Sequence, residues 1–244
     1  MLCNDSGIDK VTAMSVMIIG AGGFIGRHLA KRYIETETDL YLGVRAGNSS
    51  GLLSELVQLY PKANVTAVEI DIADPVDLKK KIETIRPETL IFAAALASQV
   101  QMATADTCFS EARALWDVSN ACSSSGVSRL IFLSSPAVYA GNKSPISEKM
   151  CMQPVTEYGL GKQLGSVVSA YCRRSLGLEI IECRLFNVYG PGDKDARLIP
   201  QLVKSVQSGK SIRLLSPNNE CDFIYITDVA VSYTHLTLPT KRIV

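Results

Sequence analysis

Short runs of apolar residues alternate along most of the chain with longer segments whose apolar positions recur at helical spacing. The apolar runs lie at residues 15–20, 40–44, 64–70, 89–95, 129–135 and 178–186. Segments between them, such as 24–35 and 75–85, place apolar side chains three and four positions apart, which is typical of amphipathic helices. Apolar strands that alternate with helices predict a parallel sheet covered on both faces. The pattern therefore predicts an α/β fold with a doubly wound parallel sheet.

The alternation of strands and helices ends near Phe186. Residues 187–230 begin with the turn-rich stretch "NVYGPGD" and then return to helical spacing. We therefore expect residues 15–186 to form one doubly wound domain and residues 187–230 to begin a second, smaller region. Residues 1–14 carry two acids and no apolar stretch, so we expect them to be a leader outside the fold.

The last stretch of the chain, residues 231–244, departs from the pattern before it. The helical continuation that we expect after Ala230 is not visible in the sequence, and the alternation of Thr, Tyr and Leu nominally reads as a strand. DNA that encodes residues 231–240 resembles a transposon-end adaptor used in sequencing libraries. We therefore expect a non-native tail in which Tyr233 and His235 have no function, and a native protein that continues for roughly 60 to 100 further residues.

Composition and charge narrow the range of partners. The chain of 244 residues is 47% hydrophobic and 20% charged with a formal net charge of +1, so we expect neither nucleic acid nor a membrane surface as a partner. No signal peptide and no apolar run of bilayer length are visible, so we expect a cytoplasmic protein. The seven cysteines form no CxxC pair and only two histidines occur, which predicts reduced thiols and no metal site.

A glycine-rich loop follows the first apolar run. In "IIGAGGFIG", Gly20, Gly23 and Gly26 stand between a predicted strand and a predicted helix. Such glycines permit a tight turn, let the backbone approach a pyrophosphate and let the helix pack on the sheet, with the helix N-terminus facing the anion. The loop therefore predicts a dinucleotide cofactor.

The second predicted strand indicates which dinucleotide binds. An acidic residue at its end would accept a hydrogen bond from a ribose 2′-hydroxyl, whereas a cation would accommodate a 2′-phosphate. Between residues 40 and 54 there is no Asp or Glu, but there is Arg45. This favours NADP over NAD, whereas a merely solvated Arg45 would leave NAD as the alternative.

Three polar residues are candidates for catalysis. Tyr158 and Lys162 in "EYGLGK" are four positions apart, so a helix would place both side chains on one face. Ser135 ends the run "RLIFLSS", and open α/β sheets bind ligands at the carboxyl ends of their strands. Its neighbour Ser134 would face the packing side, because adjacent strand residues point in opposite directions. A cation beside a phenol favours the phenolate, so Lys162 would make Tyr158 a better proton acceptor.

Several segments, in this order, resemble the extended short-chain dehydrogenase/reductase superfamily, and in particular its NAD-dependent epimerases and dehydratases of nucleotide sugars. They are "GAGGFIG", "SSPAVYA", "YGLGK", "CRLFNVYGPGD" and "CDFIYITDVA". The resemblance implies a Rossmann domain over residues 15–186 and a partial substrate-binding region over 187–230. Cofactor binding would then involve Gly20, Gly23, Phe24, Ile25, Gly26, Arg45, Asp71, Ile72, Ala94, Ala95 and Lys162, catalysis Ser135, Tyr158 and Lys162, and substrate binding Ser135, Asn187, Arg197 and Leu198.

The chain departs from that family at several positions. Cys221 stands where many members have a diphosphate-binding arginine, so Arg197 or Arg213 would have to replace it. Glu111 stands where an asparagine is frequent, and Phe92 stands where a histidine is frequent. The stretch "SSP" lacks the Thr-Asp-Glu group with which the dehydratases move protons, which argues against elimination chemistry.

The reaction implied by the resemblance is hydride transfer between a nicotinamide and a carbinol or keto carbon of a nucleotide-linked sugar, with Tyr158 moving the proton. Arg45 favours an NADPH-dependent 4-ketosugar reductase over a 4-epimerase that keeps NAD bound. A third alternative is a non-catalytic NADP-sensing or scaffold protein, although such members commonly lose the tyrosine or the lysine. The apolar face of "GSVVSAYCRRSL" fits a homodimer and packing within the chain equally well.

Overall fold

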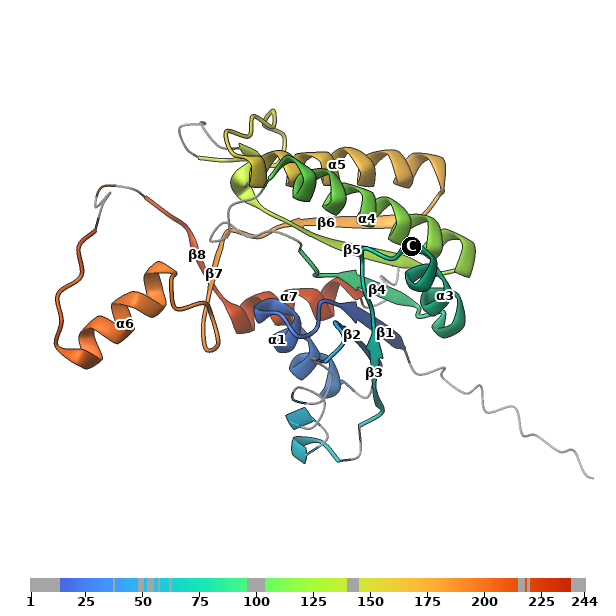
Figure 1. Ribbon diagram of the computed structural model, residues 1–244, viewed down its shortest axis with the longest axis horizontal. Coiled ribbons are helices and arrows are strands. Elements are labelled where there is room, and N and C mark those ends of the chain that lie inside the picture. Colours follow the sequence, from blue (N-terminus) through green and yellow to red (C-terminus); the bar gives the residue numbers. More distant parts are fainter. Residues whose placement is uncertain are drawn as a thin grey trace, which may run out of the picture.

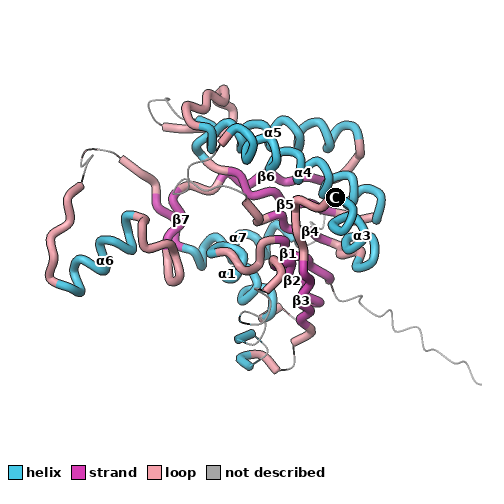
Figure 2. Tube along the Cα trace, viewed as in Figure 1, coloured by secondary structure: helices cyan, strands magenta, loops and turns pink. Residues whose placement is uncertain are grey.

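The computed structural model describes residues 14–237 except 37, 48–50, 52–54, 57, 62, 96–103, 140–144, 215–217 and 219. Its main body is a six-stranded sheet with helices on both faces (Figures 1 and 2). The strands are β1 (Ser15–Ile19), β2 (Asp39–Val44), β3 (Val65–Glu69), β4 (Thr89–Phe92), β5 (Arg129–Ser134) and β6 (Glu179–Arg184). They lie in the order β3-β2-β1-β4-β5-β6, and every pair of neighbours is parallel. The prediction of a doubly wound parallel sheet is confirmed.

Helices cover the two faces of this sheet. On one face lie α1 (Phe24–Ile34) and α7 (Ile226–Thr237), and on the other lie α3 (Pro75–Ile85), α4 (Ala105–Ser125) and α5 (Glu157–Ser175). Strand β1 shows why the apolar runs are continuous. Val16 and Ile18 pack in the core on the α1 side, whereas Met17 and Ile19 pack in the core on the α4 side. Because successive strand residues face opposite sides of a sheet, a strand covered on both sides needs apolar residues throughout.

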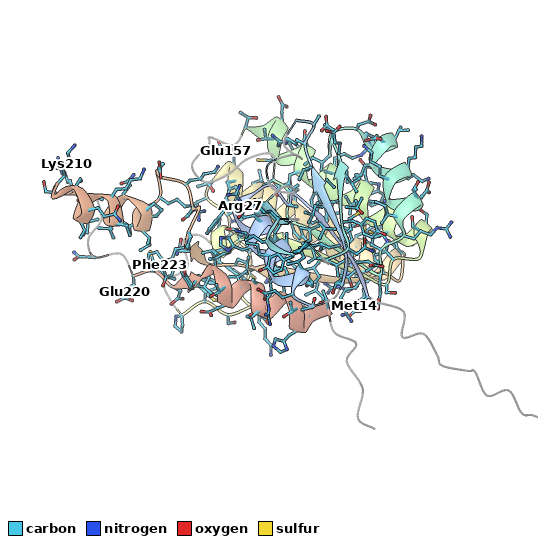
Figure 3. The ribbon with its side chains drawn as sticks, turned by 90° about the horizontal axis from the view of Figure 1, so that it is seen from below. Met14, Arg27, Glu157, Lys210, Glu220 and Phe223 are labelled. Atoms are coloured by element: carbon cyan, nitrogen blue, oxygen red, sulfur yellow. The ribbon has the colours of Figure 1, made fainter. Side chains whose placement is uncertain are left out.

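A smaller unit follows β6. Strands β7 (Asn187–Tyr189) and β8 (Phe223–Tyr225) form a two-stranded parallel sheet, and α6 (Leu198–Ser208) lies between them in the sequence. Helix α6 has no buried residue, and Figure 1 shows it projecting from the main body. Figure 3 shows Lys210 and Glu220 on the far side of the molecule from Met14. None of the helices in the described ranges has the length and apolar character that a bilayer crossing requires.

Helix α7 contradicts the expectation that the chain after Ala230 is not helical. It continues through Thr237, because Ile226, Val229, Ala230, Tyr233 and Thr237 recur at helical spacing and are all buried. The alternation that reads as a strand extends over a few residues only, whereas the helical period extends over the whole segment. The longer pattern decides the conformation, since it is the one that buries apolar surface against α1.

Two hydrogen bonds join the end of α7 to α1. The hydroxyl of Tyr33 donates to the carbonyl of Tyr233, 2.9 Å away, and lies 3.2 Å from the hydroxyl of Thr237. Tyr233 therefore packs in the core of this chain. That residues 231–244 are non-native stays a prediction, which the sequence of the source locus across the codon for Ala230 would test. Residues 1–13 and 238–244 lie outside the described residues.

Candidate active site

The glycine loop joins β1 to α1, and two of its glycines have no room for a side chain. Gly20 has a φ of +94°, and a Cβ at this position would lie 2.6 Å from the backbone nitrogen of Ala94. A Cβ at Gly26 would overlap the carbonyl oxygen of Gly20. Gly23 caps α1 with no side chain to hydrogen-bond the first turn. The loop therefore has the geometry in which backbone N–H groups at a helix N-terminus can hold an anion.

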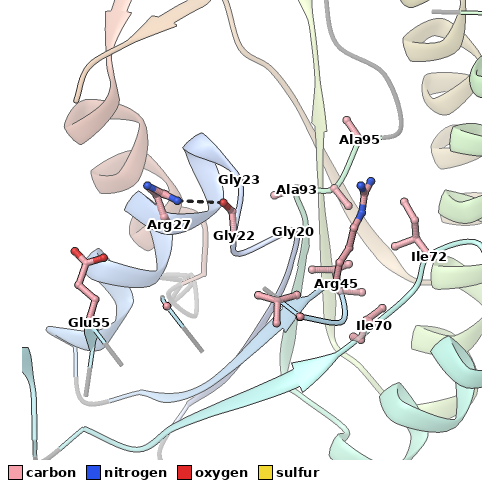
Figure 4. Close-up of a pocket in the computed structure, with 16 residues that line it drawn as sticks. Gly20, Gly22, Gly23, Arg27, Arg45, Glu55, Ile70, Ile72, Ala93 and Ala95 are labelled. Atoms are coloured by element: carbon pink, nitrogen blue, oxygen red, sulfur yellow. Dashed lines mark hydrogen bonds between the residues drawn. The ribbon is translucent and has the colours of Figure 1, made fainter. Parts of the chain in front are cut away.

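A cavity of about 700 Å³ opens beside this loop (Figure 4). Of the residues predicted to bind the cofactor, its lining includes Gly20, Gly23, Arg45, Ile72, Ala94 and Ala95. Others lie outside the lining: the ring of Phe24 packs edge-on against His28, and the carboxylate of Asp71 accepts a hydrogen bond of 2.9 Å from the backbone of Ala73. The cavity has the size of a cofactor pocket.

Charged side chains border this cavity on two sides. Figure 4 shows Arg27 and Glu55 on one side of the glycine loop and Arg45 on the other, beside Ile72. Arg27 donates a hydrogen bond of 3.4 Å to the carbonyl of Gly22. The sequence analysis missed Arg27 and Glu55. Two features of the sequence point to them. Arg27 is a cation directly after the third glycine, and Glu55 is an acid directly after residues 40–54, where a ribose ligand is expected.

The carboxylate of Glu55 is paired with a lysine of α1. The ammonium of Lys31 lies 2.6 Å from Glu55 Oε1, and this hydrogen bond holds the pKa of the carboxyl below its usual value. The negative charge at this side of the cavity is thus balanced by Lys31, which leaves the net charge of the lining positive through Arg27 and Arg45.

A second, smaller cavity of about 80 Å³ lies at the carboxyl end of β5. Ser135, Tyr158, Asn187 and Arg197 line it together. These residues come from the end of β5, from α5, from β7 and from the residue before α6, so only the fold brings them together. Ile25 lines it too, two residues after Gly23, so the start of α1 borders both cavities.

The two serines at the end of β5 both line the small cavity. The hydroxyl of Ser134 is nevertheless buried, so the expectation that it faces the packing side stays a prediction. The chain turns into the short helix η1 (Pro136–Tyr139) directly after Ser135, so the alternation of a strand does not extend to that residue. Ser135 Oγ accepts a hydrogen bond of 3.2 Å from the backbone of Ala137, whereas the buried hydroxyl of Ser134 has no partner among the described residues.

Helix α5 places Tyr158 and Lys162. It begins where the hydroxyl of Thr156 accepts a hydrogen bond of 3.1 Å from the backbone of Gly159, so Tyr158 lies in the first turn. Lys162 follows one turn later, and its ammonium lies 5.8 Å from the centre of the Tyr158 ring. Lys162 is buried and lines neither cavity, since its ammonium is bonded to Glu111 and to the carbonyl of Leu133.

Of the two arginines that could replace the arginine missing at Cys221, only Arg197 is in the lining of the small cavity. Its guanidinium donates to the carbonyl of Val188, 3.1 Å away, and lies 3.7 Å from the carboxylate of Asp193. Arg213 is exposed beyond the end of α6 and outside the lining. Leu198, predicted to border a base, begins α6 and is also outside the lining. Within the described ranges, no group of His, Cys, Asp and Glu side chains is arranged to hold a metal ion.

The fold and the two cavities together define a class of protein. A parallel sheet in this strand order, with a glycine loop after β1 and polar side chains gathered at the end of β5, is the Rossmann arrangement of short-chain dehydrogenases and reductases. The chain belongs to the NAD dependent epimerase/dehydratase family of enzymes, whose model matches residues 16–239.

Individual relatives are similar at low identity over most of the chain. An uncharacterized UDP-glucose epimerase, YtcB, from Bacillus subtilis (strain 168) is 25% identical over 230 residues, which cover 91% of this chain and 72% of YtcB. A dTDP-4-dehydro-6-deoxy-D-allose reductase from Streptomyces bikiniensis is 24% identical, with the same coverage of 91% and 72%. The crystal structure of a UDP-glucuronic acid 4-epimerase from Bacillus cereus, in complex with UDP-glucuronic acid and NAD, superposes with a TM-score of 0.80. It is 20% identical and the match covers 95% of this chain and 75% of that one, which supports the fold alone.

Proposed function

We propose that this protein transfers a hydride between a nicotinamide cofactor and a carbinol or keto carbon of a nucleotide-linked sugar, and that it acts as a 4-ketosugar reductase. The observation that supports this best is the small cavity in which Ser135, Tyr158, Asn187 and Arg197 meet. Because the start of α1 borders both cavities, a sugar held there would lie next to a dinucleotide in the larger one.

The residues of the larger cavity fit a dinucleotide. The glycine loop lies in the lining of this cavity, and the N–H groups at the start of α1 and the guanidinium of Arg27 supply donors for the phosphates of a dinucleotide. When bound, the nicotinamide supplies or accepts the hydride. The guanidinium of Arg45 would hold a 2′-phosphate, so we propose NADP rather than NAD as the cofactor.

The side chains of the small cavity have complementary tasks. The hydroxyl of Ser135 would donate a hydrogen bond to the sugar oxygen on which charge develops, and the phenol of Tyr158 would give that oxygen a proton during reduction. The ammonium of Lys162, 5.8 Å from the ring of Tyr158, stabilises the phenolate that remains. Asn187 and Arg197 would hold the diphosphate of the substrate, in place of the arginine absent at Cys221.

Cofactor absorbance tests this function directly. With a 4-keto-6-deoxy nucleotide sugar, steady oxidation of NADPH is the expected result, and Tyr158→Phe should abolish it while leaving cofactor affinity unchanged. If Tyr158→Phe oxidises NADPH at the rate of the wild type, the phenol does not donate the proton and the proposed mechanism is wrong.

A 4-epimerase with bound NAD is the second candidate, and the name of the relative YtcB supports it. Interconversion of two nucleotide sugars with no net change in cofactor absorbance would favour this candidate over the reductase. A protein that only senses NADP or serves as a scaffold would bind NADPH and show neither activity, and Tyr158→Phe would then have no catalytic effect.

We further propose that the protein works in the cytoplasm as a homodimer. The cytoplasmic location rests on an odd number of cysteines without a CxxC pair. The dimer rests on the exposed aromatic and aliphatic side chains of α4 and α5, among them Trp116 and Tyr171, whose rings stack with centroids 5.6 Å apart.

A further inference from the structure

A buried ion pair lies beside the residues proposed to exchange the proton. The ammonium of Lys162 on α5 donates a hydrogen bond to the carboxylate of Glu111 on α4. Each of these two side chains is only 5% exposed, so water screens neither charge effectively. The two residues are 51 positions apart, and only the packing of α4 against α5 brings them into contact.

The ammonium of Lys162 is fixed from two sides. Besides Glu111, it donates to the carbonyl of Leu133 near the end of β5, at a distance of 3.1 Å. Its nitrogen lies 5.4 Å from the centre of the Phe132 ring and 5.8 Å from the centre of the Tyr158 ring. An ammonium has three donors, so these two bonds leave one donor without a partner among the described residues.

Stability alone accounts poorly for a carboxylate at this position. Removing two charges from water costs about as much as their attraction returns, so a buried ion pair adds little net stability compared with apolar side chains. The carboxylate does change the electric field at Tyr158. An ammonium favours the phenolate, and a carboxylate bound to that ammonium cancels part of the effect.

We propose that Glu111 is a positioning residue of the catalytic site, which fixes the ammonium of Lys162 and weakens its electrostatic effect on Tyr158. This inference rests on the proposed function, because it concerns the proton that Tyr158 gives to the substrate. The phenol of Tyr158 is then exposed to a weaker positive potential than it would be beside an unpaired lysine. That property suits a residue that donates a proton to a keto sugar during reduction.

Of the other titratable groups on the elements around Lys162, two are engaged elsewhere, and the carboxylate of Glu157, next to Tyr158 on α5, is exposed to solvent. On β6, the carboxylate of Glu182 lies 2.9 Å from the guanidinium of Arg184. On α4, the thiol of Cys108 donates to a backbone carbonyl of α5, and burial raises its pKa so that it stays neutral. Among the described residues, Glu111 is therefore the carboxylate that acts on Lys162 directly.

The ionisation of Tyr158 can be measured without turnover. The difference in near-ultraviolet titration between a protein and the same protein with Tyr158→Phe isolates the tyrosinate of this one residue. A charge at roughly 10 Å in a medium with an effective dielectric constant of about 20 moves such a midpoint by about one pH unit. Glu111→Gln should lower the midpoint by this amount, since a negative charge that disfavours the phenolate is removed. Glu111→Asp, which keeps the charge, should leave the midpoint near that of the wild type.

The pH profile of NADPH-dependent reduction is the second readout. Its alkaline limb, where Tyr158 loses the proton it must donate, should also move down by about one unit in Glu111→Gln. The matched control is Asp117→Asn, which removes a paired carboxylate from the same helix, 2.9 Å from Arg113. This control should change neither the titration midpoint nor the limb. Glu111→Asn, smaller and equally neutral, carries the same expectation if Glu111→Gln does not fold.

The outcomes separate this inference from the proposed function. If Glu111→Gln lowers the melting temperature but leaves the midpoint and the alkaline limb unchanged, Glu111 is a structural residue and the inference is overturned. If the midpoint moves as expected while the wild type turns over no nucleotide sugar, the proposed function fails and the coupling between Glu111 and Tyr158 stands.

Discussion

At the scale of single residues, Gly20 offers the sharpest test of the cofactor loop. Gly20→Ala should abolish dinucleotide binding and destabilise the fold, because its Cβ would lie 2.6 Å from the nitrogen of Ala94. Gly177→Ala is the matched control, since Gly177 also has a positive φ, of +65°, but nothing lies within 4 Å of the added Cβ. The control should cost about 1 kcal/mol for the backbone conformation alone and leave binding intact. Urea unfolding and a fluorescence titration with NADPH measure both effects, and equal losses in the two variants would contradict the tight packing of the loop.

Arg45 tests the choice of cofactor. A charge-assisted hydrogen bond to a phosphate contributes about 1.5–3 kcal/mol, so Arg45→Ala should weaken NADPH binding by roughly 10- to 100-fold. The affinity for NADH should change much less, because NADH lacks the 2′-phosphate. Arg213→Ala, which removes an exposed arginine outside both cavity linings, is the control and should change neither affinity. An equal loss for both cofactors would assign Arg45 to another part of the dinucleotide.

The same scale shows what a linear sequence can reveal about a site. Ser135, Tyr158 and Asn187 could be predicted because each stands in a short motif whose spacing is itself the signal, and the fold brings them to one cavity. The pairing of Lys162 with Glu111 could not be predicted. Glu111 stands out in the sequence only because the family frequently has an asparagine there, and no local pattern connects it to a lysine 51 positions away. Contacts of this kind depend on how α4 and α5 pack, which the chain specifies only through the whole core.

At the scale of elements, the N-terminus of α5 decides where Tyr158 lies. Thr156→Ala removes the hydroxyl that caps this helix and should cost about 1 kcal/mol of stability. Asp74→Ala is the control, since Asp74 caps α3 in the same way by accepting from the backbone of Val76 and Asp77. Both variants should be destabilised to a similar extent. Only Thr156→Ala should also lower kcat, by about tenfold, because small displacements of a catalytic group are costly. Equal kcat values in the two variants would contradict a positioning role for the cap.

The contact between α1 and α7 predicts how stability depends on pH. Burial raises the pKa of the Tyr33 phenol above its usual value of about 10, so the folded chain keeps this proton at a pH where the unfolded chain loses it. The stabilisation is complete below about pH 10 and is lost as the pH rises further. Tyr33→Phe should cost about 1–2 kcal/mol at neutral pH, because the bonds to α7 are lost, and should make the alkaline decline shallower. Urea unfolding from pH 7 to 11 measures both, and an unchanged alkaline slope would contradict the burial of the hydroxyl.

The elements also differ in how well the sequence predicts them. The six strands of the main sheet follow the apolar runs closely. The central strands are covered on both faces and are apolar almost throughout, whereas the edge strands β3 and β6 keep polar residues such as Glu69 and Glu182. Strands β7 and β8 are only three residues long, and their pairing joins segments more than 30 residues apart, so no local pattern indicates it. Helix α7 was missed because its helical stripe coincides with a short alternation of Thr, Tyr and Leu.

At the scale of the whole molecule, the outer faces of α4 and α5 carry apolar side chains that the core does not use. In α5, Gly161, Gly165 and Cys172 are buried, whereas Val167 is 61% and Tyr171 is 50% exposed. Helix α5 therefore carries apolar side chains on two faces. One face packs in the core of the chain, and packing within the chain does not account for the other. The exposed Trp116 of α4 stacks on Tyr171 and continues the outer face, which is the kind of apolar patch that a second copy of the chain can cover.

Substitutions on this outer face should therefore change the oligomeric state of the protein and leave the fold of each chain intact. The wild type is expected to elute as a dimer, and Val167→Glu combined with Tyr171→Glu should give a monomer, because like charges at the centre of an apolar interface stay desolvated and unpaired. Val206→Lys on α6 is the control, since Val206 is an 82% exposed apolar residue on a helix far from this face, and it should leave the mass unchanged. Size-exclusion chromatography with light scattering measures the mass, and circular dichroism checks the fold. A wild-type protein that is monomeric at micromolar concentration would contradict the proposed dimer. Trp116 and Tyr171 would then have no assigned partner.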